Sequence, residues 1–415
     1  MTTDNEKSSE ISFFQGGELI GPAENDNQEE NLNVIKQKIS DLMNMKSINF
    51  LLGAGTSSTA IPPMKEMKEK VDEEIEGLDN NARDRSLKSL YGKLSSGTEN
   101  LEKILGALYS KRAYQEAIGS RDGVAEEVIK IIEETIFEEI NVNMSAAASQ
   151  ETLDIYKRFY QKIGLRGRDL DRACVFTTNN DLMSEISLDY LNINYNDGFG
   201  GGVKKYFNPA RFFYTYSRKI DDAYEKYEPI QPMVYLFKLH GSINWVEGEE
   251  NVFFNITQID LDCHGGPPDN NVLIYPNPLK QNISLGSPYA DLIREFQNKL
   301  LKPHSALFII GYSFSDEHIN NAIYQALASN SSLSVVVFGN YPDAPICKSL
   351  DKRIYNLYGE ITKEGGGKEK IHYFKYIVEE IIPDQDQNKD QDLLRRFMDF
   401  IESAKRGEGV GDDNR

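Results

Sequence analysis

Residues 47–57 read SINFLLGAGTS, and this stretch decides the predicted fold. The apolar run 47–52 is short and ends at Gly53, which predicts a buried strand that enters a tight turn. In the turn, Gly53-Ala54-Gly55-Thr56-Ser57, glycines let the backbone approach a pyrophosphate, and free N–H groups bind anions. An ordinary turn without a ligand explains the Gly-x-Gly spacing about equally well. The residues at the other strand ends are therefore needed to distinguish a ligand site from an ordinary turn.

The same pattern returns along the chain. Four more short apolar runs, each ending in small or polar residues, lie at 173–177, 234–239, 307–310 and 333–338. Helical spacing of apolar residues occurs at 32–44, 287–301 and 316–328. Strands that alternate with helices predict an α/β fold with a Rossmann-like, mainly parallel sheet flanked by helices on both faces. A last strand is expected at 371–377.

Beyond the sheet, we expect one large domain over residues 32–383 that contains a large helical insertion. A tail precedes this domain and another follows it. The insertion, at about 64–170, is rich in Glu, Lys, Leu and Ala. Residues 1–31 read as a flexible acidic N-terminal tail, and residues 384–415 as a linker, an amphipathic helix and a disordered end. Four apolar residues of the first tail could dock on a partner: Phe13, Phe14, Leu19 and Ile20.

The composition excludes several classes of protein. The 415 residues include 46 Lys and Arg and 65 Asp and Glu, which gives a net charge of −19. This charge argues against general binding to the nucleic-acid backbone. No apolar run approaches the roughly 18 residues of a membrane span, and the acidic start resembles neither a signal nor a transit peptide. Cys174, Cys263 and Cys347 are far apart and odd in number, so we expect no disulfide framework and a cytoplasmic location.

Polar residues follow each predicted strand, where ligands of open parallel sheets bind. They are Thr177-Thr178-Asn179-Asn180-Asp181, His240-Gly241-Ser242, Gly311-Tyr312-Ser313 and Gly339-Asn340. His240 is well placed as a general acid or base near neutral pH, although a lone histidine is more often structural. Asn and Asp also simply end strands or cap helices. Five successive strand ends of this kind favour a ligand site.

Two common nucleotide-binding patterns are broken in this sequence. Ser58 stands at the third glycine position of the dinucleotide fingerprint, and Pro62-Pro63 interrupts a direct helix. No Gly-Lys-Ser or Gly-Lys-Thr follows the first turn, so a Walker A loop is absent as well. A plain dehydrogenase and a P-loop ATPase are both disfavoured.

The ordered set of motifs resembles the sirtuin (SIR2-like) family. The resemblance rests on Gly53 to Ser57 with Ile61-Pro62, on residues 177–181 and 238–242, and on Gly311-Tyr312-Ser313. The form GYSFSDEHI at 311–319, with Asp197-Gly198-Phe199, is more similar to the bacterial sirtuin-like NADases of antiphage defence than to protein deacylases. The resemblance implies a sirtuin-like fold and an NAD-binding catalytic domain over residues 32–383.

The resemblance also implies roles for particular residues around NAD+, which would be the substrate. The implied catalytic residues are Asn179, His240 and Asp181, with Asn179 and Asp181 lining the nicotinamide-ribose pocket. The residues implied to contact the cofactor are Gly53, Ala54, Gly55, Thr56, Ser57, Ile61, Pro62, Thr178, Gly311, Ser313 and Asn340. Of these, Gly311, Ser313 and Asn340 would contact the phosphate and adenosine side.

Two departures separate the chain from sirtuin deacylases. Deacylases bind zinc through two Cys-x-x-Cys pairs, whereas no two cysteines here have that spacing, and Cys263-His264 alone cannot complete a tetrahedral site. Pro63-Met64-Lys65 replaces the acidic-aromatic-basic triplet of deacylases. We therefore expect no metal and no structural zinc, and we favour hydrolysis of the nicotinamide–ribose bond over deacylation.

The resemblance further implies an antiphage effector that depletes cellular NAD+ in abortive infection. Such proteins are triggered by a partner, and the first candidate is a separately encoded HerA-like ATPase. We also expect a homo-oligomer, no membrane contact, and contact with nucleic acid only through a partner. The alternatives are an NAD-dependent protein deacylase, a non-catalytic module that binds NAD or ADP-ribose and, less favoured, a nuclease.

Overall fold

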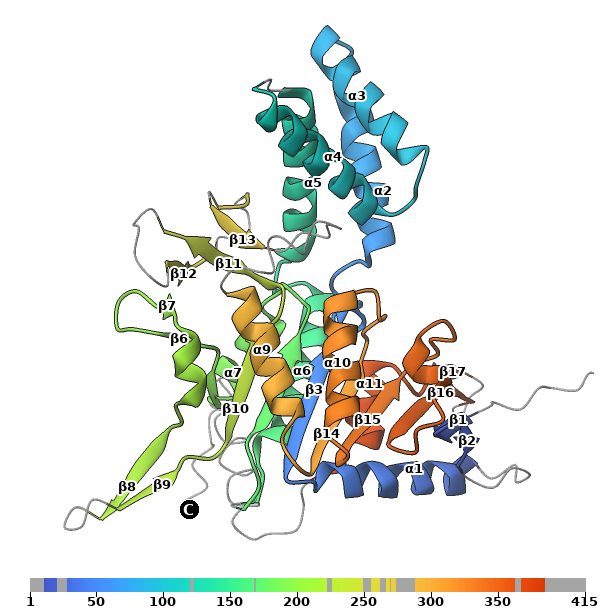
Figure 1. Ribbon diagram of the computed structural model, residues 1–415, viewed down its shortest axis with the longest axis vertical. Helices are drawn as coiled ribbons and strands as arrows, with labels where there is room; N and C mark the ends of the chain where they lie inside the picture. Colours follow the sequence, from blue (N-terminus) through green and yellow to red (C-terminus); the bar gives the residue numbers. More distant parts are fainter. Residues whose placement is uncertain are drawn as a thin grey trace, which may run out of the picture.

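The computed structural model describes residues 11–20, 28–119, 123–167, 169–221, 226–248, 255–261, 266–268, 270–273, 288–362 and 367–384. Its centre is a ten-stranded sheet in the order β2-β1-β16-β15-β14-β3-β4-β10-β5, with β17 paired to β16 (Figure 1). The bounds are β2 Glu18–Leu19, β1 Ile11–Gln15, β16 Ile354–Thr362, β15 Leu333–Phe338, β14 Ser305–Ile310, β3 Ser47–Leu52, β4 Ala173–Thr177, β10 Met233–Lys238, β5 Asn194–Asn196 and β17 Lys368–Lys370. Every pairing from β16 across to β5 is parallel, and β1, β2 and β17 add antiparallel pairs.

This sheet confirms the predicted fold class. β3, β4 and β15 have the predicted bounds, and β10 and β14 differ from them by one or two residues. Every residue of β3, β4 and β14 is buried, because both faces of the sheet are covered. Strands covered on both faces read as continuous apolar runs, which is why the sequence reveals them.

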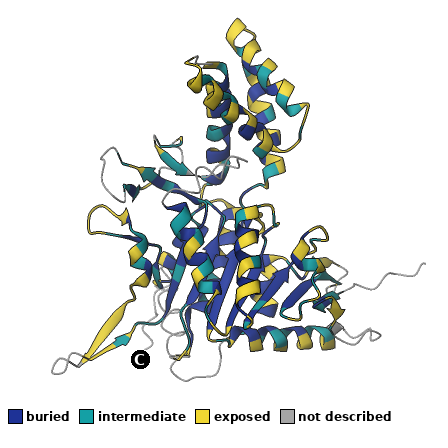
Figure 2. Cartoon of the chain, viewed as in Figure 1, coloured by how far each residue is buried: buried dark blue, intermediate teal, exposed yellow. Residues whose placement is uncertain are grey.

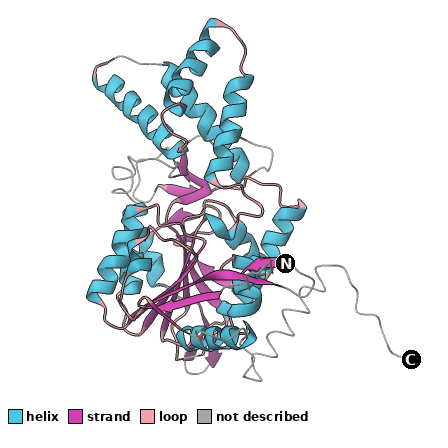
Figure 3. Cartoon of the chain, turned by 90° about the vertical axis from the view of Figure 1, so that its right-hand side faces the viewer, coloured by secondary structure: helices cyan, strands magenta, loops and turns pink. Residues whose placement is uncertain are grey.

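Two helical layers cover the sheet (Figure 3). One layer holds α1 (Gln28–Met43), α6 (Ala147–Gly164), α7 (Met183–Tyr190), α11 (Phe374–Tyr376) and the π-helical turn η4 (Ile377–Ile381). The other holds α9 (Tyr289–Leu300), α10 (Glu317–Ser329) and the 3-10 turn η3 (Pro345–Lys348). Successive side chains of β3 point to opposite faces, so Phe50 packs in the first layer and Leu51 in the second.

A separate helical cap, defined here as α2 to α5, stands above the carboxyl ends of the central strands (Figures 1 and 2). Its helices are α2 (Met64–Gly77), α3 (Ala82–Ser95), α4 (Leu101–Ala117) and α5 (Gly123–Ile140). Asn81 and Asn100 cap α3 and α4 through their side-chain oxygens. The four helices share their own apolar core, whereas α6, the last helix of the expected insertion, packs on the central sheet instead.

A second sheet and a hairpin lie beside the central sheet, and neither is expected from the sequence. The second sheet has the order β13-β11-β12-β7-β6. Its strands are β13 (Asn271–Leu273), β11 (Gly241–Glu247), β12 (Ile256–Gln258), β7 (Tyr206–Phe207) and β6 (Phe199–Gly200), and the hairpin pairs β8 (Ser217–Asp221) with β9 (Lys226–Pro229). An aromatic cluster of Phe199, Phe207 and Trp245 joins the second sheet to the main core. Apart from β11, the strands of the second sheet have only two or three residues, which is too few to show a periodicity.

Two local predictions are wrong. Residues 371–377 are not a strand: Phe374, Tyr376 and Ile377 belong to α11 and η4, whose apolar residues all face the first layer. The N-terminal tail is not free over residues 11–20, where β1 pairs with β16 and Phe13 is buried against Tyr355. The strand forms because the edge of β16 is available for pairing, which the sequence of residues 11–15 alone does not reveal.

Other expectations fall outside the described residues. These are the rest of the N-terminal tail apart from the start of α1, the Cys263-His264 pair, and the linker, helix and end over residues 385–415. Among the described residues, no helix combines the length and the apolar character that a membrane crossing requires.

Candidate active site

A cavity of about 370 Å³ lies between the strand ends of the central sheet and the helical cap. We call its sheet side the floor, defined by the loops that follow β3, β4, β10 and β14. Most of the residues implied by the resemblance line this cavity: Ala54, Gly55, Ser57, Ile61, Pro62, Thr178, Asn179, Asp181, His240, Gly311 and Ser313. The parallel strands end at one edge, so loops from four distant parts of the chain meet there.

Three of the implied residues lie elsewhere. Gly53 and Thr56 are part of the first turn but do not line the cavity. Asn340 lines a second cavity of about 460 Å³, together with aromatic residues such as Tyr341 and Tyr373. Gly55 and Gly311 border both cavities, so the two spaces adjoin at this pair of glycines.

Glycines let the turn after β3 pack directly against the turn after β14. The N–H of Gly55 donates to the Gly311 carbonyl oxygen at 3.0 Å, and the N–H of Gly53 donates to that of Ile310 at 2.9 Å. A Cβ on Gly53 would lie only 2.5 Å from the Gly311 oxygen, and Gly311 has a φ of +66°. That conformation favours glycine. Contact between the two backbones therefore explains the glycines without any ligand.

The first turn does not present the row of free N–H groups expected from its sequence. It forms the 3-10 turn η1 (Ala54–Thr56), in which the N–H of Thr56 donates to the Gly53 carbonyl at 2.9 Å. The N–H of Ser57 likewise donates to the Ala54 carbonyl at 3.1 Å. With Gly53 and Gly55 also donating to the β14 side, four of the five N–H groups of residues 53–57 are occupied within the protein. A tight turn closes on its own carbonyls, which corrects the expectation.

Three buried hydroxyls form a network beneath this turn. The Tyr156 hydroxyl, from α6, lies 2.7 Å from Thr56 Oγ1 and 3.0 Å from Ser57 Oγ. Thr56 Oγ1 donates to the Gly53 carbonyl at 2.8 Å, and Ser57 Oγ donates to Asp181 Oδ2 at 2.9 Å. Burial raises the pKa of the Tyr156 phenol, which therefore stays protonated at neutral pH.

This network orients the side-chain amide of Asn179. Asn179 Nδ2 lies 3.0 Å from Thr56 Oγ1 and 3.2 Å from Ser57 Oγ. Both hydroxyls already donate their only proton elsewhere, so both accept from the amide N–H groups of Asn179. The hydroxyl network therefore holds the Nδ2 end of Asn179, a residue that lines the cavity.

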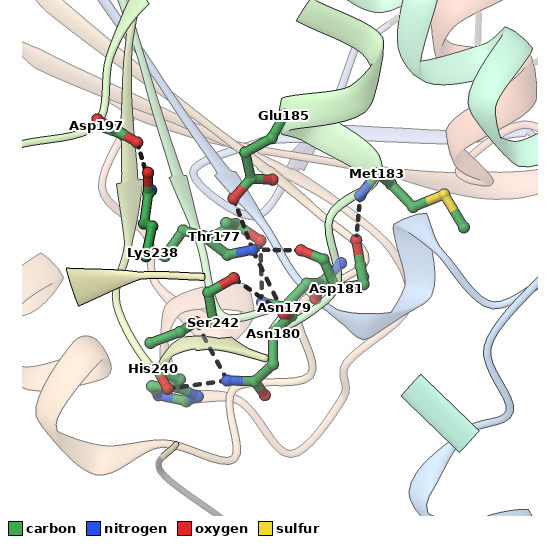
Figure 4. A network of polar contacts seen from close by, with 12 residues as sticks. Thr177, Asn179, Asn180, Asp181, Met183, Glu185, Asp197, Lys238, His240 and Ser242 are labelled. Atoms are coloured by element: carbon green, nitrogen blue, oxygen red, sulfur yellow. Dashed lines mark hydrogen bonds and ion pairs between the residues drawn. The ribbon is translucent and has the colours of Figure 1, made fainter. Parts of the chain in front are cut away.

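The loops after β4 and β10 are joined to each other (Figure 4). Asn180 Nδ2 donates to the His240 carbonyl at 2.8 Å, and the N–H of Ile243 donates to the Asn180 carbonyl at 3.0 Å. Asp181 Oδ1 accepts from the N–H of Met183 at 2.9 Å, where α7 begins. Asn180 thus fixes the backbone of His240, and Asp181 uses both carboxylate oxygens to hold its own loop.

His240 is paired with Asp316, which precedes α10. The distance from His240 Nε2 to Asp316 Oδ2 is 3.1 Å, and the two side chains are 14% and 8% exposed. The other oxygen of Asp316 caps α10 by accepting from the N–H of His318 at 2.9 Å. One carboxylate therefore fixes a helix end and the direction of an imidazole, a common way to orient a histidine for proton transfer.

The helical cap supplies the opposite, apolar wall of the cavity. Its contributions are Met64, Met67, Ile136 and Ile140, together with one carboxylate, Glu102. Among the described lining residues, the acidic and basic side chains are those of Glu102, Asp181, Asp316 and His240, with no Lys or Arg. Such a lining favours a ligand region that carries or develops positive charge.

Besides the apolar residues of the cap wall, sequence reasoning missed Tyr156, Glu102 and Asp316. Asp316 had a signal, because it ends the motif that follows β14 and stands where a helix cap is expected. Tyr156 and Glu102 had none, since they come from helices that only the tertiary fold brings to the strand ends. Among the residues that the structure describes, no group of three or more His, Cys, Asp or Glu is arranged to hold a metal ion.

Among the comparisons with known proteins, the match to a family model agrees with the motifs. Residues 173–358 match the family model of the SIR2-like domain, a range that begins at β4 and includes Asn179, His240 and Gly311. No curated protein matches the sequence. One similar solved structure is a mutant Sir2 homologue in complex with 2′-O-acetyl ADP ribose, with 11% identity, 87% of this chain and 97% of that chain covered, and a TM-score of 0.35. Another, reported for the mechanism and regulation of Sir2 enzymes, has 11% identity, coverage of 87% and 98%, and a TM-score of 0.34. Residues 173–358 of this chain are thus similar to the SIR2-like domain.

Proposed function

We propose that this chain is an NAD+ hydrolase that cleaves the bond between nicotinamide and ribose. The observation that carries the proposal is the meeting of Asn179, Asp181 and His240 on one cavity whose described lining has carboxylates but no Lys or Arg. The SIR2-like match supports an NAD-related function in general. Nicotinamide in NAD+ is a cationic leaving group, and positive charge develops on the ribose as it departs, so a lining of this charge favours the transition state.

The reaction balances without a further reactant. A water oxygen bonds to C1′ of the ribose while the bond from C1′ to the ring nitrogen breaks, and the electron pair stays with the ring as neutral nicotinamide. The water loses one proton, and ADP-ribose is the second product. His240, aligned by Asp316 at 3.1 Å, accepts that proton or one from a ribose hydroxyl.

The other floor residues orient the substrate and the water. Asn179 lines the cavity, where its Oδ1 accepts from the water or a ribose hydroxyl. Asp181 contributes negative charge while holding its loop through Ser57 and Met183. The phosphates would cross the Gly55 and Gly311 border, and the adenosine would enter the second cavity beside Asn340.

The test follows free nicotinamide released from NAD+ by purified Asn179→Ala and His240→Ala variants. Each substitution should reduce the rate by roughly 100-fold or more. Matched controls are Asn33→Ala, at an exposed position of α1, and His304→Asn, which keeps a residue that tolerates the φ of 53° at that position. Undiminished release by both site variants would refute the assignment.

The proposal extends to the biological setting. We propose that the chain is an antiphage effector that depletes NAD+, acts as a homo-oligomer in the cytoplasm, and works with a separately encoded partner such as a HerA-like ATPase. The experiment measures NAD+ turnover by the chain alone and with the products of neighbouring genes, together with the mass of the assembly. Binding of NAD+ without turnover in every combination would instead favour a non-catalytic module, and deacetylation of a peptide would favour a deacylase.

A further inference from the structure

Lys238, the last residue of β10, is a buried lysine directly behind the candidate site. Its side chain is 2% exposed, and its Nζ lies 2.9 Å from Glu185 Oε1 (Figure 4). The same ammonium donates to the main-chain carbonyls of Asn180, at 3.4 Å, and of Asp181. A buried ammonium is costly unless it is paired and hydrogen-bonded, so these three contacts account for its presence.

The position of Lys238 connects it with both site loops. In the parallel pair of β4 and β10, Lys238 lies beside Thr177, and each strand continues into a loop that carries site residues. Its contacts are with the loop after β4, between Asn179 and the start of α7. Its own chain reaches His240 two residues later.

We infer that Lys238 is a positioning residue that turns the carbonyls of Asn180 and Asp181 away from the cavity. With these carbonyls fixed, the Asn179 amide meets the hydroxyl network and the Asp181 carboxylate meets Ser57. Glu185, in the first turn of α7, balances the buried charge. This inference rests on the proposed function for its effect on turnover, but its effect on the loop is independent of that function.

The competing explanation is that Lys238 and Glu185 form a purely structural ion pair. A variant that neutralises both residues distinguishes this explanation from a positioning role. Lys238→Met alone leaves Glu185 as a buried charge without its partner, so misfolding would be ambiguous. The double variant Lys238→Met with Glu185→Gln removes both charges and should keep the thermal unfolding temperature close to that of the native chain. Glu185→Gln alone keeps the ammonium on the two carbonyls.

For a positioning role, kcat for nicotinamide release should fall at least tenfold in the double variant, with a much smaller change in KM. Glu185→Gln should retain its kcat per folded molecule even where it unfolds at a lower temperature. Lys88→Met is the matched control, since Lys88 Nζ also donates to two carbonyls, those of Glu76 and Leu78, but within the helical cap. A double variant with the kcat of the native chain would overturn the inference.

Hydrogen exchange tests the loop without any reference to NAD+. In the double variant, the N–H groups of Ile243 and Met183, which donate to Asn180 and Asp181, should exchange at least tenfold faster. The N–H of Ile309 in β14 should exchange at its native rate. Unchanged exchange at Ile243 and Met183 would overturn the positioning role, whereas faster exchange in a chain that never cleaves NAD+ would support it and count only against the proposed function.

Discussion

The floor of the cavity and the helical cap above it are built by opposite means. Buried hydrogen bonds hold the floor: Tyr156, Asn179 and Asp181 meet in one network, and glycine backbones touch. The cap is held mainly by an apolar core, with an ion pair from the buried Lys68 to Asp72 and exposed pairs such as Arg83 to Glu127. Exposed pairs of this kind contribute about 0–1 kcal/mol each, so the apolar core carries the stability of the cap.

The two walls of the cavity therefore have different roles. The floor fixes the orientation of the polar groups, and the cap determines how well a ligand fits. Hydrogen bonds are directional, so the floor presents the amide of Asn179 and the imidazole of His240 in fixed orientations. Apolar side chains repack at modest cost, so the wall formed by Met64, Met67 and Ile136 can adapt to a ligand. We therefore expect floor substitutions to change the rate of turnover and cap substitutions to change stability or affinity.

The largest expected effect is a loss of stability of the helical cap alone. Phe137 is fully buried in the cap core, and Phe137→Ala should lower the free energy of unfolding of the cap by about 3–5 kcal/mol. Hydrogen exchange should show lost protection in α2 to α5 and native protection in β3 and β14. Tyr114→Ala, at a 66% exposed position of α4, is the control, with a change within about 0.5 kcal/mol. Equal loss in the sheet would mean that cap and floor unfold as one unit.

The next effect breaks the packing of the floor. Gly311→Ala puts a Cβ 2.7 Å from the Thr56 nitrogen at a φ of +66°, which should destabilise the chain by about 3 kcal/mol. Gly92→Ala in α3 is the matched control, because no atom lies within 4 Å of its added Cβ. This control should gain about 0.5–1 kcal/mol from helix propensity. Thermal unfolding compares the two, and similar values would contradict the tight contact between the turns.

A third prediction separates the two roles of Asp316. Asp316→Asn keeps an oxygen to cap α10 but removes the charge beside His240, so the rate of nicotinamide release should fall about tenfold or more. Thermal unfolding of Asp316→Asn should stay close to that of the native chain, because the asparagine oxygen still caps α10. Asn81→Ala removes the cap of α3 and should cost about 1 kcal/mol of stability at an unchanged rate of nicotinamide release. A native rate in Asp316→Asn would leave Asp316 as a helix cap only.

The smallest expected effect is on the pH dependence of stability, and it concerns His372, which lines the second cavity. Burial, with a further contribution from Lys370, holds the pKa of His372 below its usual 6.5. The unfolded chain therefore binds a proton more readily, so the stability that neutral His372 contributes is present above pH 6.5 and lost as pH falls through the lowered pKa. His372→Gln should flatten this part of the stability curve measured by denaturant unfolding. The same slope in both proteins would contradict the prediction.

The sequence predicted the parallel core well because its strands are buried on both faces. β3, β4 and β15 stand out as continuous apolar runs, and their ends carry the turn and capping residues that local chemistry requires. It did not predict β1, although Ile11, Phe13 and Phe14 are apolar, because the strand forms by pairing with β16, which lies far away in the sequence. Most strands of the second sheet were missed because they have only two or three residues each.

What the sequence determined by itself is the set of strand ends and, through the topology of a parallel sheet, their meeting at one edge. The tertiary structure alone determines which partners hydrogen-bond to those residues and that the helical cap lies opposite them. Tyr156 reaches Thr56 across 100 positions, and Asp316 reaches His240 across 76. The physical reason is that apolar periodicity and turn propensity act over a few residues, whereas a buried polar network forms only when separate segments exclude water together.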